Sequence, residues 1–167
     1  MAHAVEKYKE CVGRAPRGMW PAEGAVSQSS LPFFAENNVS WIATDQGVLT
    51  QSGQWGYEID NPNVLCRPYR AEEGAAQVSV FFRDTVLSDA IGFHYHGFSD
   101  YREAARDFLH RMKEHCAHHD YDDAVHTVIL DGENAWGAYR EDARPFLHAF
   151  YGLLEENTEV RTLTFSE

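Results

Sequence analysis

Apolar positions along the chain recur at two spacings that alternate from one segment to the next. Unbroken runs of apolar and β-branched residues predict short buried strands at Val39–Thr44, Val78–Phe82, Val125–Leu130 and Val160–Phe165. Helical spacing, or typical start and stop residues, predicts helices at Ala4–Val12, at Ser27–Asn38, from Asp100 onward and at Pro145–Glu155. Positions 50 to 70 are rich in Gly, Asn, Pro and Gln, which predicts the longest irregular loop.

The alternation of strand and helix is typical of parallel β/α units, so the expected fold class is α/β. No internal repeat or low-complexity segment divides the chain, and residues 1–167 are expected to form a single domain. A length of 167 residues is short for a complete α/β barrel, which takes about 250 residues.

Composition and charge narrow the class of protein. A hydrophobic content of 44% and an aromatic content of 13% indicate a globular chain. The net charge of -12 argues against a nucleic-acid partner, which needs a basic face, and no basic amphipathic stretch suits a membrane surface. No apolar run approaches the ~18 residues of a membrane span, and the start of the chain lacks the apolar core of a signal peptide.

The cysteines and histidines predict no metal site and no cofactor. Cys11, Cys66 and Cys116 are odd in number and lack the spacing of metal ligands, so they are expected to be reduced thiols in a cytoplasmic protein. A helix would bring His115 and His119 onto one face, a spacing that zinc can use, but the sequence indicates no rigid third ligand beside them.

The segment Val128–Trp136 carries the strongest chemical signal in the chain. A buried strand ending there would deliver Asp131 and Glu133 to the rim of a sheet, where open α/β sheets and barrels bind ligands. A carboxylate beside an aromatic ring suits a sugar site. A turn in which Asp-Gly only reverses the chain explains the same residues, and the segment alone leaves both interpretations open.

Three further segments combine acidic and aromatic residues, and they contribute Trp20 with Glu23, Trp41 with Asp45, and Arg83, Asp84 and Asp89. With these segments in place, the chain resembles glycoside hydrolase family 57, the retaining α-amylase and amylopullulanase type. The matching motifs, in order, are GMWPAEG, WIATDQGVL, FFRDTVLSDAIGF and ILDGENAW. They cover nearly the whole chain, and four ordered motifs are far more specific than any one.

The resemblance implies a fold, a substrate and two catalytic positions. It implies a partial (β/α)7 barrel with parallel strands that acts on α-glucans, with Asp131 as the acid/base. The nucleophile position falls on Gln46, where the family has Glu. The family's first strand, which carries a His-containing motif, has no counterpart before Met1, so we expect open strand edges that a second copy or another chain covers.

The amide at position 46 decides how much activity is expected. A retaining glycosidase uses two carboxyls roughly 5 to 5.5 Å apart, one of which attacks the sugar. An amide has nearly the same shape but is neutral and a poor nucleophile, so we expect a loss of roughly a thousandfold or more in rate. Asp45 is a weak substitute, because neighbouring side chains on a strand point to opposite faces.

The aromatic candidates and the remaining acids of the loops are assigned to substrate binding. Trp20, Trp41 and Trp136 are candidate sugar platforms, although a tryptophan at a strand end packs into a core as often. Glu23 is expected to contact substrate or a group that does, and Glu133 to support its neighbours rather than to react.

The segment after the second strand is expected to organise the site. Arg83, Asp84 and Asp89 are assigned, with Asp45, to the substrate-binding region. Arg83 and Asp84 are expected to form an ion pair that orients neighbouring acids, and Asp89 to fix the turn that contains Ser88, with a sugar contact as the alternative.

Three hypotheses of function follow. The first is a retaining α-glucan hydrolase or transglycosylase whose activity is weak or absent because of Gln46. The second is an α-glucan-binding protein without catalysis, and the third is a subunit that completes a barrel with another chain. The first two require Gln46 and Asp131 to meet across a shared groove.

Overall fold

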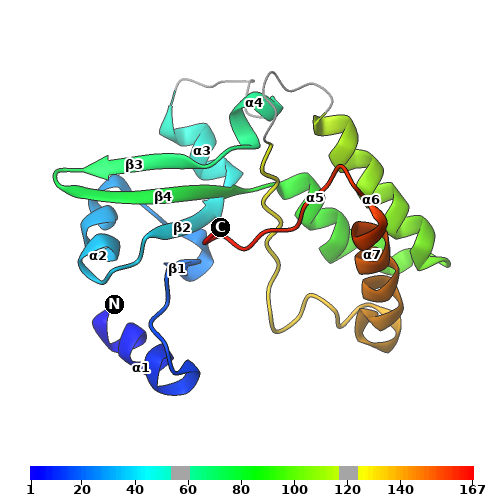
Figure 1. Ribbon diagram of the computed structural model, residues 1–167, viewed down its shortest axis with the longest axis horizontal. Helices are drawn as coiled ribbons and strands as arrows, with labels where there is room; N and C mark the ends of the chain where they lie inside the picture. The colour runs from blue at the N-terminus through cyan, green and yellow to red at the C-terminus, as the bar shows by residue number, and fades with distance from the viewer. Residues whose placement is uncertain (54–60, 117–123) are drawn as a thin grey trace.

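The computed structural model describes residues 1–53, 61–116 and 124–167, and it places a sheet and a group of helices side by side (Figure 1). In the described residues the strands are β1 (Gly18–Met19), β2 (Trp41–Asp45), β3 (Tyr69–Glu73) and β4 (Ala76–Arg83). Their order in the sheet is β1-β2-β4-β3. The strands β1, β2 and β4 run parallel, whereas β3 pairs antiparallel with β4.

The α-helices of the described residues are α1 (Ala2–Val12), α2 (Leu31–Glu36), α3 (Gln46–Ser52), α4 (Pro62–Leu65), α5 (Thr85–Asp89), α6 (Tyr101–Cys116) and α7 (Arg144–Glu156). Short 3-10 segments occur at η1 (Ala22–Gly24), η2 (Gln28–Ser30), η5 (Tyr95–Gly97) and η6 (Arg140–Ala143), and η4 (Ala90–His94) is a π-helix.

The sheet has its own buried core. In β4 the buried side chains of Val78, Val80 and Phe82 alternate with more exposed ones, as the two-residue period of a strand requires. In β2 the three consecutive residues 42–44 are all buried, which is typical of a parallel strand covered on both faces. Side chains of α2, α3 and α4 complete this cluster.

A second core lies between α6 and α7, on the other side of the extended segment that runs down the middle of Figure 1. Phe108 and Phe146 are buried there, and Phe146 stacks on Phe150 with ring centroids 5.8 Å apart. Tyr95 is fully buried against the same rings. Its hydroxyl donates to Asp107 at 2.8 Å, which gives the polar end of the buried ring a partner.

Most of the predicted helices and two predicted strands are confirmed. The helix α1 ends at Gly13 as expected. The carboxylate of Asp100 caps the start of α6 by accepting a hydrogen bond from the backbone N–H of Arg102 at 2.8 Å. The strands β2 and β4 lie where the apolar runs indicated, and α2 begins at Leu31, with Pro32 in its first turn.

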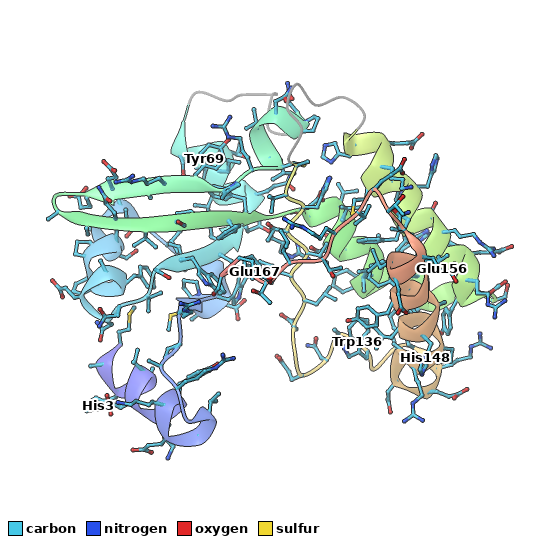
Figure 2. The ribbon with its side chains drawn as sticks, viewed as in Figure 1. His3, Tyr69, Trp136, His148, Glu156 and Glu167 are labelled. Carbon is cyan, nitrogen blue, oxygen red and sulfur yellow. The ribbon has the colours of Figure 1, made fainter. Side chains whose placement is uncertain are left out.

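Two predicted strands, Val125–Leu130 and Val160–Phe165, are wrong. Both segments are extended, but neither joins the sheet ladder in the described structure. The backbone of the first segment instead forms hydrogen bonds with the residue that caps α5 and with a side chain of that helix. The second follows α7 and crosses back to the sheet, where the chain ends at Glu167 (Figures 1 and 2).

The strand β3 was not predicted, because Tyr69, Arg70 and Glu72 give its sequence little apolar pattern. Its antiparallel pairing also departs from the expectation of parallel strands only. The α/β class is confirmed, with a mostly parallel sheet that does not close into a barrel in the described residues. No helix among those residues has the length and apolar character needed to cross a membrane.

Candidate active site

An ion-pair network lies where β2 and β4 end. Asp45 and Arg83 are register partners on these parallel strands, so both side chains reach the same edge of the sheet. The guanidinium of Arg83 lies 3.6 Å from the carboxylate of Asp45 and 2.6 Å from that of Asp89. Its Nε also donates to the carbonyl of Ile129 at 3.0 Å. The Arg83 side chain is only 16% exposed, so its charge is balanced mainly by these two acids rather than by water.

The predicted ion pair between Arg83 and Asp84 is wrong. Successive side chains on extended backbone point to opposite faces, so Asp84 points away from Arg83 into the protein. Arg83 takes Asp45 and Asp89 as its partners instead. The expected role of Asp89 in its own turn is therefore replaced by a contact with the end of β4.

Gln46 is the first residue of α3 and follows β2 directly. The carboxylate of Asp45 caps this helix by accepting from the N–H of Gly47 at 2.8 Å. The side-chain oxygen of Gln46 accepts a hydrogen bond from the backbone N–H of Thr85 at 2.9 Å. The carboxamide is thereby fixed against the first turn of α5, beside the Arg83 network.

The segment that carries Asp131 is held to the same strand ends. The carbonyl of Thr127 accepts from the N–H of Asp84 at 2.8 Å, and the N–H of Ile129 donates to the buried hydroxyl of Ser88 at 3.2 Å. Asp131 follows two residues later and is exposed, as is Glu133 in the turn beyond it. The structure thus brings the segments of Gln46 and Asp131 to one region through α5.

Trp136 lies in the helical part of the molecule, beside the base of α7 (Figure 2). Its ring is 5.8 Å from that of Tyr139 and packs against the core between α6 and α7. This contact supports the core-packing alternative for Trp136 rather than a sugar platform.

The GMWPAEG loop also reaches the end of β2. The hydroxyl of Thr44 donates to the carbonyl of Gly24, and a Cβ at Gly24 would lie 3.6 Å from the backbone nitrogen of Asp45. The same Cβ would come within 2.9 Å of the Trp20 ring, which shows how closely that ring covers the loop. Trp20 remains 39% exposed and Glu23 is exposed, so both face solvent beside the strand ends.

Trp41 is not brought together with these residues. It begins β2 whereas Asp45 ends it, and four strand steps separate the two by roughly 13 Å. Its indole stacks on Phe165 with ring centroids 4.6 Å apart and meets Phe81 edge-on. The strand thus carries Trp41 and Asp45 to opposite ends of the sheet, and the substrate-binding role expected for Trp41 stays a prediction.

Two open hollows lie around α7, one lined by residues that include Arg102 and His148 and the other by residues that include Arg144 and Tyr151. Neither of these hollows contains Gln46 or Asp131. The ends of β2 and β4 lie outside both hollows, on a surface where several loops meet.

A second group of polar side chains lies apart from the Arg83 network. We call it the Cys–His–Asp cluster, and it consists of Cys66, Asp84, His115 and His126. Cys66 follows α4, Asp84 caps α5, His115 is in the last turn of α6, and His126 precedes the segment of Asp131. The Sγ of Cys66 lies 3.9 Å from Nδ1 of His115 and 3.6 Å from Nδ1 of His126. The same two nitrogens lie 3.8 and 3.5 Å from Oδ2 of Asp84.

The two acidic groups of the cluster ionise more readily than usual. Burial alone would raise the pKa of Asp84, but His115, His126 and the N–H of Leu87 outweigh it and hold that pKa far below its ordinary value. Burial likewise raises the pKa of the Cys66 thiol, and the two histidines more than reverse this effect. Both groups therefore lose their protons more readily than the same side chains do in water.

Sequence patterns did not find this cluster. Cys66, Asp84 and His126 are each separated by tens of residues and come from different elements, so no local motif joins them. The predicted pair of His115 and His119 cannot be compared directly, because His119 lies outside the described residues.

With this geometry in place, the class of protein follows from comparison with known families. The chain matches the model of glycosyl hydrolase family 57 over residues 1–167. The chain belongs to that family. No curated protein matches it.

Two solved structures share the fold. The first is a 4-alpha-glucanotransferase from Thermococcus litoralis, with a TM-score of 0.74 and 17% identity, covering 98% of this chain and 24% of that one. The second is the alpha-amylase AmyC from Thermotoga maritima, with a TM-score of 0.76 and 20% identity, covering 97% of this chain and 42% of that one. This chain thus spans less than half the length of either enzyme.

Proposed function

We propose that this chain forms part of an α-glucan-active site of the retaining type, with Gln46 at the position of the nucleophile and Asp131 as the acid/base. The observation that carries the proposal is the convergence of both segments on α5, in a chain of glycosyl hydrolase family 57. The two structural neighbours, a glucanotransferase and an amylase, support an α-glucan as the substrate.

The chemistry assigns a different role to each residue. In a retaining reaction a carboxylate attacks the anomeric carbon while an acid gives its proton to the departing glycosidic oxygen. Water then releases the sugar, and the same acid, now a base, takes the proton of that water. Asp131 is exposed and suits the proton transfers. The neutral amide of Gln46 cannot perform the attack, so hydrolysis by the present chain is weak or absent.

The surroundings of Gln46 support the assignment. Arg83 and the start of α5 both place positive charge or N–H groups near position 46. Such groups would stabilise a carboxylate there and the negative charge that returns to it when the glycosyl ester is cleaved. The exposed ring of Trp20, on the neighbouring loop, offers a flat face for a sugar.

A binding protein without catalysis is the second candidate, and the amide at position 46 favours it. Both candidates predict binding of α-glucan. They differ in whether Gln46→Glu gains hydrolytic turnover. A partner chain and a cytoplasmic location stay predictions of the sequence.

The experiment combines binding and turnover. Isothermal titration with maltoheptaose is expected to show binding by the unaltered chain. Release of reducing sugar is expected to rise by roughly a thousandfold in Gln46→Glu, and to be lost again when Asp131→Asn is added. Gln51→Glu, on the exposed side of the same helix, is the matched control and is expected to change nothing. Absence of both binding and gained turnover would overturn the proposal.

A further inference from the structure

The Cys–His–Asp cluster gathers four side chains of the kinds that bind zinc, and the glucan chemistry uses none of them. The ligand atoms of Cys66, His115 and His126 all lie within 4.8 Å of one another. Thiolate and imidazole together are the ligands that tetrahedral zinc sites favour, and a carboxylate completes the four.

The distances around the cluster are compatible with a shared central atom. The two contacts between an imidazole nitrogen and Asp84 measure 3.5 and 3.8 Å, which is longer than an ordinary hydrogen bond between nitrogen and oxygen. The two contacts between an imidazole nitrogen and the Cys66 sulfur measure 3.6 and 3.9 Å. Around a zinc ion with bonds of about 2.0 to 2.3 Å, the edges of a tetrahedron measure roughly 3.3 to 3.6 Å. Cys66, His115 and His126 are close enough to one another to share an ion, and Asp84 would move toward the Cys66 sulfur to become the fourth ligand.

The contacts also converge on the same atoms. Both the thiol of Cys66 and the carboxylate of Asp84 face Nδ1 of His126, and both face Nδ1 of His115. One ring nitrogen carries at most one hydrogen, so it cannot donate to both neighbours at once. A catalytic triad would instead place its acid and its nucleophile on opposite nitrogens of one ring. A shared cation satisfies all of these contacts together.

Burial supplies an independent reason for a cation. The side chain of Asp84 is 3% exposed, and its Oδ2 has no hydrogen-bond partner among the residues that the structure describes. Its other oxygen accepts from the N–H of Leu87 at 2.9 Å. A buried carboxylate oxygen that faces two imidazole nitrogens without a hydrogen bond to either is costly. A divalent cation bound among these side chains would balance the charge of the carboxylate.

We propose that the Cys–His–Asp cluster binds one zinc-type divalent cation. The ion would join the end of α4, the start of α5, the last turn of α6 and the segment leading to Asp131. Cys66 belongs to the core of the sheet, whereas α6 belongs to the second core, so the ion links the two cores. His115 is 27% exposed and gives the ion a route from solvent.

The test uses the whole chain, stripped of metal with a chelator and titrated with Co²⁺ as a spectroscopic probe. The expected result is one equivalent of Co²⁺ with four-coordinate visible bands and a thiolate charge-transfer band, both removed by Zn²⁺. Zn²⁺ in hundredfold excess over its Kd is expected to raise the unfolding midpoint by roughly 5 to 10 °C. It is also expected to protect Cys66, but not the exposed Cys11, from alkylation read by mass spectrometry.

Variants separate the cluster from the rest of the chain. Cys66→Ser is expected to lose the thiolate band, whereas Cys11→Ser, in the exposed helix α1, keeps it. Asp84→Asn keeps an oxygen for the cap of α5 and is expected to lose most of the Zn²⁺-dependent shift. The proposal is overturned if the unaltered chain shows no thiolate band at one equivalent, or if Zn²⁺ does not protect Cys66. These two results do not depend on how the variants fold, and neither involves α-glucan.

Discussion

The carboxamide oxygen of Gln46 accepts the backbone N–H of Thr85, and this bond joins the first residue of α3 to the first residue of α5. The bond fixes the side chain that we propose occupies the position of the nucleophile. A glutamate oxygen could accept the same N–H, so the site is shaped for either side chain.

A substitution that removes the side-chain oxygen of Gln46 should lower the stability of the fold, whereas one that keeps an oxygen there should not. Gln46→Ala is expected to lower the free energy of unfolding by about 1 kcal/mol, because the N–H of Thr85 loses its partner at a half-buried position. Gln46→Glu is expected to unfold within a few tenths of a kcal/mol of the unaltered chain. Urea denaturation followed by circular dichroism measures both, with the exposed Gln51→Ala as control. Equal losses in the two Gln46 variants would contradict the assignment.

Arg83 is expected to be the most sensitive charged residue of the sheet edge. Arg83→Met removes the partner of two acids and the donor to Ile129, so a loss of about 2 to 3 kcal/mol is expected. Binding of maltoheptaose should weaken as well, because the segment leading to Asp131 loses its tie to β4. Arg106→Met, on the exposed face of α6, serves as the control and should change the unfolding free energy by less than about 0.5 kcal/mol.

The contact between Asp107 and Tyr95 predicts a pH dependence of stability. Burial raises the pKa of Asp107, but hydrogen bonds from Arg111 and Tyr95 outweigh it and hold that pKa below its ordinary value. A carboxyl whose pKa is lowered by folding stabilises the protein above its unfolded pKa, near 3.8, and loses that contribution as the pH falls through the folded pKa.

Asp107→Asn is therefore expected to be less stable than the unaltered chain at pH 7. The difference between them should shrink as the pH drops below about 4. Urea midpoints measured between pH 7 and pH 3 decide the matter. A difference that stays constant over this range would contradict the assigned pKa direction.

Gly18 is expected to be intolerant of any side chain. A Cβ at this position would lie 1.9 Å from the ring of Trp41, and that ring is held by its stack on Phe165. Gly18→Ala should lower the unfolding free energy by about 3 kcal/mol and change the tryptophan fluorescence. Gly92→Ala is the matched control, since a Cβ there meets no heavy atom within 4 Å, and it should be neutral or slightly stabilising.

The sequence predicted those helices and strands whose formation depends mainly on residues close to them in the sequence. The helices α1 and α6 have local caps at Gly13 and Asp100, α6 and α7 have periodic apolar faces, and β4 has its alternation of buried positions. The wrong strand at residues 125–130 has a tertiary cause. Residues 125–130 have the composition of a strand, but whether an extended segment joins a ladder depends on what lies beside it, and the start of α5 lies there.

The sequence by itself determined the α/β class, the helices and the ordered motifs of the family, because propensity, periodicity and motif order are written in local residues. Only the tertiary structure decided the partners of each charged group. It turned Arg83 toward Asp45 and Asp89, and it turned Asp84 the other way, toward two imidazoles. The physical reason is that adjacent side chains of an extended chain leave on opposite faces, and what each face meets is set by segments far away in the sequence.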